Sequence, residues 1–162
     1  MTNITFAQRT YTRSKGQQNT FGDFTCVHCG RLVQAHELLS GVRNRNHCPH
    51  CLSSRHLDLY AAGDRLAACK GRMQPAALTL KHDGNKYRCD SGELMLVHIC
   101  DDCGKLSINR IAADDDNERL LQVFYASQQL DSATCAVLAR AGITPLDARQ
   151  RELVQRRLWG GK

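Results

Sequence analysis

Short apolar runs separated by turn residues fill the middle of the chain, between Leu57 and Arg110. This alternation is typical of strands in a small antiparallel sheet. The Asp83-Gly84 pair between two of the runs is a strong hairpin signal. The pattern therefore predicts a β domain with a loop at 36–41 and strands at 32–33, 57–60, 76–81, 86–88, 93–99 and 106–111.

After residue 117 the apolar residues take helical spacing. Helices are expected over 117–130 and 132–141, with Cys135 packed inside the second. A third helix is expected to begin at Thr144-Pro145, because threonine caps a helix and proline suits its first turn. The residues that this helix would bury are Leu146, Leu153, Val154 and Trp159. Together with the strands, these helices make the predicted fold class α+β.

Composition limits the kind of protein. Aromatic residues make up only 6% of the 162 residues and the mean hydropathy is −0.43, which argues against one large core. The first residues form no apolar signal segment, and no apolar run is long enough to cross a bilayer. We therefore expect a cytoplasmic protein that does not associate with membranes. In a reducing compartment, nine cysteines favour metal binding over disulfides.

Two CxxC pairs carry the clearest chemistry. Cys26 and Cys29 form the first pair and Cys48 and Cys51 the second, within the spacing range of a four-cysteine zinc site. Four thiolates complete a tetrahedron and leave no coordination position for water or substrate. The sequence therefore predicts a structural zinc site rather than a catalytic one.

A second site is predicted from a repeat. The segment ICDDCGKL matches TCVHCGRL almost position for position, which makes Cys100 and Cys103 candidate zinc ligands. Cys69 is the expected third ligand. For the fourth, Cys89 is favoured as a soft ligand, with His98 as the alternative. The chain is thus expected to hold two Zn²⁺ ions.

Basic residues surround the metal ligands. The formal net charge of +6 and the pI near 8.9 are compatible with a polyanionic partner. Residues 1–20 resemble a flexible basic arm that could order against phosphates. The residues expected to contact RNA are Arg31, Arg43, Arg45, Asn46, His47, Arg55 and Arg110.

The residues 45–49 spell RNHCP, and the chain resembles the bacterial RNHCP-domain family that is named for this motif. The resemblance runs from about 24 to 115 and includes both CxxCG motifs, Asn109-Arg110 and Asp114-Asp115. It implies a zinc-ribbon-like protein, similar to ribosome-associated zinc ribbons, but no activity. The expected organisation is a basic arm at 1–20, a double zinc-ribbon domain at 21–116 and a helical extension at 117–162.

Three classes of function remain open. The favoured one is a zinc-stabilised RNA-binding protein associated with the ribosome, with ribosomal RNA as its partner. A protein-interaction or zinc-handling module is the alternative. A metal-dependent nuclease with His47 as general base is the third, but a zinc ligand directly beside His47 leaves little room for a second metal. We therefore expect no catalytic residue.

Overall fold

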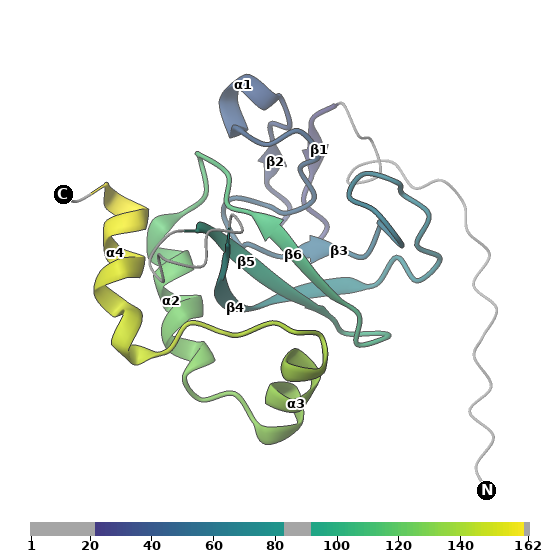
Figure 1. Cartoon of the computed structure of the whole chain (residues 1–162). Coiled ribbons are helices and arrows are strands. Elements are labelled where there is room, and N and C mark those ends of the chain that lie inside the picture. The colour runs from purple at the N-terminus through teal and green to yellow at the C-terminus, as the bar shows by residue number, and fades with distance from the viewer. Residues whose placement is uncertain (1–21, 83–91, 161–162) are drawn as a thin grey trace, which may run out of the picture.

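A four-stranded antiparallel sheet forms the centre of the protein in a computed structural model that describes residues 22–82 and 92–160 (Figure 1). Its strand order is β3-β4-β5-β6. The bounds are Ser54–Arg55 for β3, Arg72–Lys81 for β4, Glu93–Cys100 for β5 and Leu106–Arg110 for β6. The strands expected at 76–81, 93–99 and 106–111 are thus confirmed. The Asp83-Gly84 hairpin and the strand at 86–88 lie outside the described residues.

A smaller ribbon precedes this sheet. Strands β1 (Phe24–Thr25) and β2 (Leu32–Val33) pair antiparallel, and the short helix α1 (Glu37–Ser40) follows. The loop expected at 36–41 is therefore wrong. The His36 side chain accepts a hydrogen bond from an amide of the first turn and caps α1.

The helices that follow the sheet cover both of its faces. They are α2 (Asn117–Ser127), α3 (Ser132–Arg140), the 3₁₀ helix η1 (Ala148–Gln150) and α4 (Arg151–Trp159). Strand β5 alternates its side chains between the faces. Leu94 and Leu96 pack with Phe124 of α2, whereas Val97 packs with Leu138 of α3. The helices after 117 therefore share their cores with the sheet.

The last helix begins later than the sequence predicts. Asp147, not Thr144, is the N-cap, and it forms a capping box with Gln150 at η1. The segment before it runs along β4, where the Leu146 amide donates to the Leu78 carbonyl and the Thr79 hydroxyl donates to the Thr144 carbonyl. These hydrogen bonds to β4 hold the backbone extended, so the helical segment begins only after Asp147.

Burial at the C-terminal end is confirmed for some residues and corrected for others. Leu146, Leu153 and Val154 are buried as expected. Trp159 is 48% exposed and Cys135 is exposed, so both burial predictions are wrong. Within 22–82 and 92–160, no helix has the length and apolar character needed to span a bilayer.

Candidate metal centres

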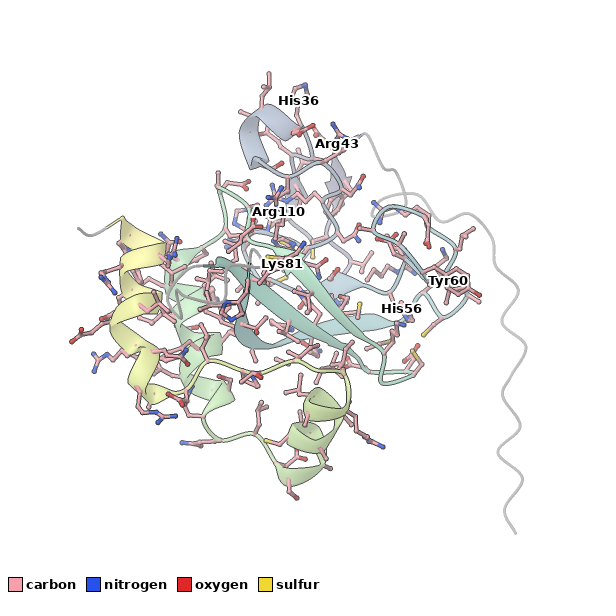
Figure 2. The ribbon with its side chains drawn as sticks, in the orientation of Figure 1. His36, Arg43, His56, Tyr60, Lys81 and Arg110 are labelled. Carbon is pink, nitrogen blue, oxygen red and sulfur yellow. The ribbon has the colours of Figure 1, made fainter. Side chains whose placement is uncertain are left out.

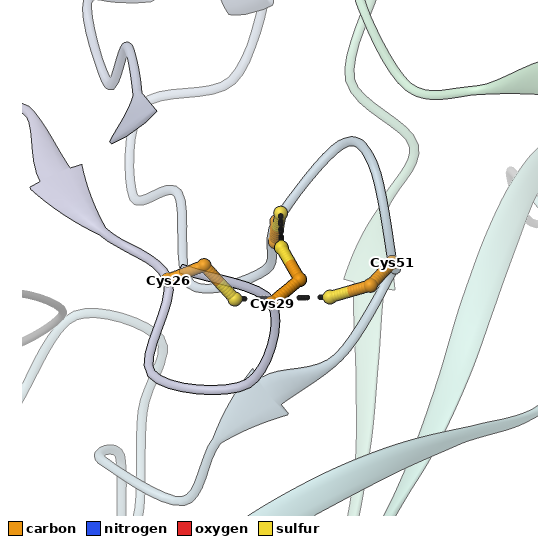
Figure 3. Close-up of side chains that lie close together, drawn as sticks. Cys26, Cys29 and Cys51 are labelled. Atoms are coloured by element: carbon orange, nitrogen blue, oxygen red, sulfur yellow. Dashed lines mark hydrogen bonds between the residues drawn. The ribbon is translucent and has the colours of Figure 1, made fainter. Parts of the chain in front are cut away.

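The four cysteines of the two N-terminal CxxC pairs meet in one cluster. Their sulfur atoms all lie within 4.8 Å of one another. Cys26 Sγ is 3.7 Å from Cys51 Sγ, and Cys29 Sγ is 3.6 Å from Cys48 Sγ, so each close pair joins one motif to the other (Figure 3). Two loops distant in sequence thus converge on a single point.

The spacing fits one zinc ion. Sulfur atoms placed tetrahedrally at about 2.3 Å from Zn²⁺ are about 3.8 Å apart, close to the separations in the cluster. A disulfide would need about 2.05 Å, and all four cysteines are free. With only sulfur donors and no open position, the cluster suits a structural zinc ion, and the predicted first site is confirmed as a cluster that can hold one.

Local backbone geometry builds each CxxC turn. The amide of Gly30 donates to the Cys26 carbonyl at 2.9 Å, and the amide of Leu52 donates to the Cys48 carbonyl at 2.8 Å. Both turns need a left-handed residue at this position, with φ of 74° at Gly30 and 58° at Leu52. A leucine is costly there, but Leu52 is 1% exposed and its burial in the main core offsets the strain.

Burial makes a cation necessary for these ligands. It raises the pKa of the Cys26 thiol and, more strongly, that of Cys48 above their ordinary values. Zinc binds thiolates, so the ion must displace these protons. Without a metal the buried thiols of Cys26 and Cys48 would stay protonated and would attract their neighbours only weakly.

A second cluster lies where β4 begins and β5 ends. It contains Cys69, Cys100 and Cys103, as predicted, and its fourth member is His56. Cys69 Sγ is 3.6 Å from Cys100 Sγ, and His56 Nδ1 is 3.3 Å from Cys103 Sγ. Burial first, and Lys105 second, lower the pKa of His56, which favours the neutral imidazole that a metal requires. Three sulfurs and one nitrogen form a standard zinc donor set, so both clusters can hold zinc.

Among the described residues, His56 takes the fourth position in place of the alternative His98. Cys89 lies outside the described residues. His98 is not part of the cluster: its Nε2 is 2.6 Å from the Leu52 carbonyl and its Nδ1 is 2.8 Å from Asn109 Nδ2. Burial lowers the pKa of His98 to about 3, so it is a neutral core residue. No local motif marks His56, because only the pairing of β3 with β4 brings it to the cysteines.

The identity of this ligand can be tested by counting zinc. Purified His56→Ala protein is expected to hold one zinc ion per chain instead of two, because three cysteines leave the second site open. His56→Cys should restore the second ion, since a thiolate is also a zinc ligand. Elemental analysis measures both. A His56→Ala protein that keeps two ions, together with a Cys89→Ser protein that loses one, would instead assign the ligand to Cys89.

The Arg45-Asn46-His47 segment is buried, contrary to the expectation that it contacts RNA. Arg45, whose side chain has no exposed surface, pairs with Asp115 at 3.3 Å and with Asp114 at 2.9 Å. His47 Nε2 lies 2.7 Å from the other oxygen of Asp115. These contacts tie the second CxxC turn to the segment before α2. Burial excludes Arg45 and His47 from surface contact with RNA. A buried His47 also cannot reach a substrate, so it cannot be the general base of a nuclease.

Asn46 ties the same segment to a different loop. Its amide nitrogen donates to Asp58 at 3.0 Å, and its amide oxygen accepts from Arg65. Asp58 also accepts the amide of Gly63 at 2.9 Å and that of Arg65 at 3.1 Å. Asn46 is 8% exposed, so its predicted contact with RNA is wrong as well. The three polar residues thus organise the fold around both metal clusters.

The other predicted contact residues lie at or near the surface, among them Arg43 and Arg110, which Figure 2 labels. Arg31 is exposed, Arg43 lies 3.8 Å from Glu37, and Arg110 Nε donates to Glu93 at 2.7 Å. Arg55 is half-buried, and its direct cross-strand partner is Arg72, which sequence reasoning did not single out. This pairing follows from the register of β3 against β4 and could not be inferred from the sequence.

Comparison with known proteins gives one result. The family model for the RNHCP domain matches residues 21–121, more than half of the chain. No curated protein and no solved structure matches the chain. The match covers both metal clusters and the aspartates that pair with Arg45. On the strength of this match and of the clusters it spans, the chain belongs to the RNHCP-domain family.

Proposed function

We propose that this protein binds RNA, with ribosomal RNA as the expected partner, through a basic surface beside the second metal cluster. The basic surface consists of Arg55, Lys70, Arg72 and Lys105. The zinc ions have a structural role in this function, because both donor sets are complete without water or substrate.

The pairing of Arg55 with Arg72 is the observation that carries the proposal. The two residues lie directly opposite each other on β3 and β4, so their side chains share one face of the sheet. Like charges in this position destabilise a sheet. An anion placed between them would turn this repulsion into attraction, and phosphate suits the planar guanidinium group.

Lys70 adds to the same positive region. Burial lowers its pKa first, and the nearby cations Arg55 and Arg65 lower it further. Arg55 Nε also donates to the Lys70 carbonyl at 3.1 Å, which fixes the two residues together. The cations Arg55 and Arg65 close to Lys70 add to a positive region of the kind that attracts phosphate.

The metal cluster determines where these cations lie. Arg55 precedes the ligand His56, Lys70 follows the ligand Cys69, and Lys105 lies two residues after Cys103. Because two of the four basic residues adjoin a zinc ligand in sequence and a third lies two residues from one, the metal would hold them in place before RNA binds. Preorganisation of this kind lowers the entropic cost of binding.

Replacing Arg72 is expected to weaken binding. Arg72→Ala should lower the affinity for ribosomal RNA several-fold and flatten the dependence of log affinity on log salt by about 0.7 to 0.9, the value of one lost phosphate contact. Arg140→Ala, which removes an exposed arginine from the end of α3, is the matched control and should change neither quantity. Filter binding across a salt series measures both.

Sedimentation with purified ribosomal subunits gives the second readout. The wild-type protein should accompany a subunit at low salt, and Arg72→Ala should dissociate at a lower salt concentration. A wild-type protein that binds neither ribosomal RNA nor either subunit at low salt would overturn the proposal.

A protein-interaction module is the second candidate, and exposed apolar residues of the N-terminal ribbon favour it. Leu38 is 89% exposed and Leu39 is 55% exposed on α1, while Leu32 of β2 is 66% exposed. Leu38→Glu should abolish capture of a protein partner while leaving RNA affinity unchanged. The opposite pattern, loss of RNA binding alone, would exclude this role for α1.

A further inference from the structure

We infer that the loop 58–66 is a preformed stacking site, in which the ring of Tyr60 stacks on an unpaired base of RNA. The inference rests on the proposed function and deepens it, because it names single-stranded RNA as the form recognised beside the basic surface. Stacking on an exposed aromatic ring is the usual way in which proteins bind unpaired bases.

Asp64 organises the tip of the loop. Its carboxylate accepts hydrogen bonds from the amides of Leu59 at 2.9 Å, Tyr60 at 2.8 Å, Ala61 at 2.9 Å and Leu66 at 3.0 Å. The hydrogen bonds from the Ala61, Leu66 and Leu59 amides hold the pKa of Asp64 well below its ordinary value. This carboxylate therefore fixes the backbone on both sides of Tyr60.

The base of the loop is equally constrained. The Ala67 amide donates to the Leu57 carbonyl at 2.8 Å and closes the loop. Asp58 accepts two further loop amides and the side chain of the buried Asn46. Arg65 adopts a left-handed backbone with φ of 56°, which residues with side chains rarely take. Such a conformation persists only where its surroundings hold it.

The apolar side chains of this rigid loop nevertheless face solvent. Tyr60 is 86% exposed and Leu66 is 62% exposed, and Figure 2 shows Tyr60 at the outer end of the loop. The exposed Tyr125 of α2 differs, because its ring lies 5.5 Å from that of Phe124 and belongs to the helix packing. The hydrogen bonds of the loop thus hold an aromatic ring in solvent, where it contributes little to the packing of the fold.

Hydrogen bonds connect the loop to the basic surface. Lys70 Nζ donates to the Arg65 carbonyl at 3.3 Å, and the Lys70 carbonyl accepts from Arg55 Nε. One single-stranded RNA would thus place a phosphate between Arg55 and Arg72 and a base on Tyr60. Positive charge and an exposed ring on adjoining rigid segments are the two components of a single-strand binding site.

The experiment compares binding of a labelled single-stranded RNA with that of a duplex of the same length, using the full chain with its zinc. Tyr60→Ala should lower affinity for the single strand by roughly 5- to 150-fold, leave its salt dependence unchanged, and leave duplex binding unaffected. Tyr60→Phe should retain wild-type affinity because it keeps the ring. Tyr125→Ala is the control for loss of a tyrosine elsewhere, and zinc content checks that each variant is folded.

A spectroscopic readout separates stacking from an indirect effect. In a Trp159→Phe background, Tyr60→Trp places the single tryptophan in the loop, and its emission should be quenched by the single strand but not by the duplex. If wild-type protein binds RNA and Tyr60→Ala binds the single strand equally well, the inference is overturned while the proposed function stands. The same holds if Tyr60→Ala loses only a co-purifying protein, which would make the loop a protein contact. If wild-type protein binds no RNA, both fail.

Discussion

Loss of zinc from the four-cysteine cluster is expected to unfold the N-terminal half of the domain. The apolar core there contains Phe24 and Val33 and is otherwise built from the metal ligands, chiefly Cys26 and Cys48. Strands β1 and β2 have two residues each, too few to be stable alone. Structural zinc contributes about 10–16 kcal/mol of apparent binding energy at pH 7, far more than this small core can supply.

The replacement Cys48→Ser tests this directly. Cys48 has no exposed surface, so the variant both loses a ligand and leaves a hydroxyl in its place. We expect one zinc ion per chain instead of two, and loss of dispersed amide resonances from residues 22–51 in a heteronuclear NMR spectrum, whereas β3 and His56 stay with the main sheet and the second cluster. Cys135→Ser, which changes an exposed cysteine outside both clusters, should keep two ions and the wild-type spectrum. A folded N-terminal half in Cys48→Ser would contradict the expectation.

The zinc affinities of the two clusters should decrease with different steepness as the pH is lowered. Burial raises the thiol pKa at Cys48 and, to about 12, at Cys100, so these two thiols are protonated at neutral pH without metal and zinc must displace their protons. Affinity therefore falls as pH falls. The first cluster would bind zinc through four thiolates, but the second through three thiolates and the His56 imidazole, whose pKa burial lowers, so zinc binding should release more protons at the first cluster. Competition with a chromophoric chelator between pH 6 and 8 should give the steeper slope for the first cluster.

Asp115→Ala is expected to lower the free energy of unfolding by about 3–5 kcal/mol, the cost of leaving a buried charge without its partner. Asp115 and Arg45 have no exposed side-chain surface, and Asp115 also accepts from His47 and from the Ala112 amide. The variant would leave Arg45 with only the half-exposed Asp114 to balance its charge. Denaturant unfolding of the zinc-loaded protein measures the change.

The neighbouring aspartate provides the control. The Asp114 side chain is 41% exposed, so water replaces much of its interaction with Arg45 when it is removed. Asp114→Ala should therefore cost about 1 kcal/mol or less. Equal effects at the two positions would show that the buried pair is not what links the second CxxC turn to the segment before α2. The same reasoning makes Arg45→Ala unsuitable as a test of RNA contact, because it would destabilise the fold.

Local chemistry in the sequence was enough to predict both metal clusters in outline. A CxxC turn places two ligands through its own backbone, and only its partner pair comes from elsewhere. Seven of the eight ligand atoms in the two clusters belong to cysteines that were predicted as ligands, six of them from CxxC pairs and the seventh being Cys69. The strands at 76–81 and 93–99 were also predictable, because β5 is buried on both faces and reads as a continuous apolar run.

Other features depended on contacts between distant segments. The segment 57–60 looks apolar enough for a strand, but its Leu59 and Tyr60 amides donate to Asp64, and Asp58 accepts the amide of Gly63, so the chain folds into a loop. Thr144-Pro145 has the residues of a helix start, but hydrogen bonds to β4 keep it extended. Side-chain hydrogen bonds within the loop outweighed the strand preference in the first case, and long-range hydrogen bonds to β4 outweighed the helix-start preference of about 1 kcal/mol in the second.

By itself, the sequence determined that this chain is built around cysteine-based metal sites, because the ligands come in short motifs whose geometry is local. Tertiary structure decided what the residues beside them do. Arg45, Asn46 and His47 look like surface groups for RNA, yet the fold buries all three against aspartates that lie 12 to 70 residues away. It brings His56 to the cysteines and Arg55 to Arg72 through one strand pairing. Burial and strand register are properties of the whole fold. The sequence around a polar residue does not indicate whether its side chain will face solvent or the protein interior.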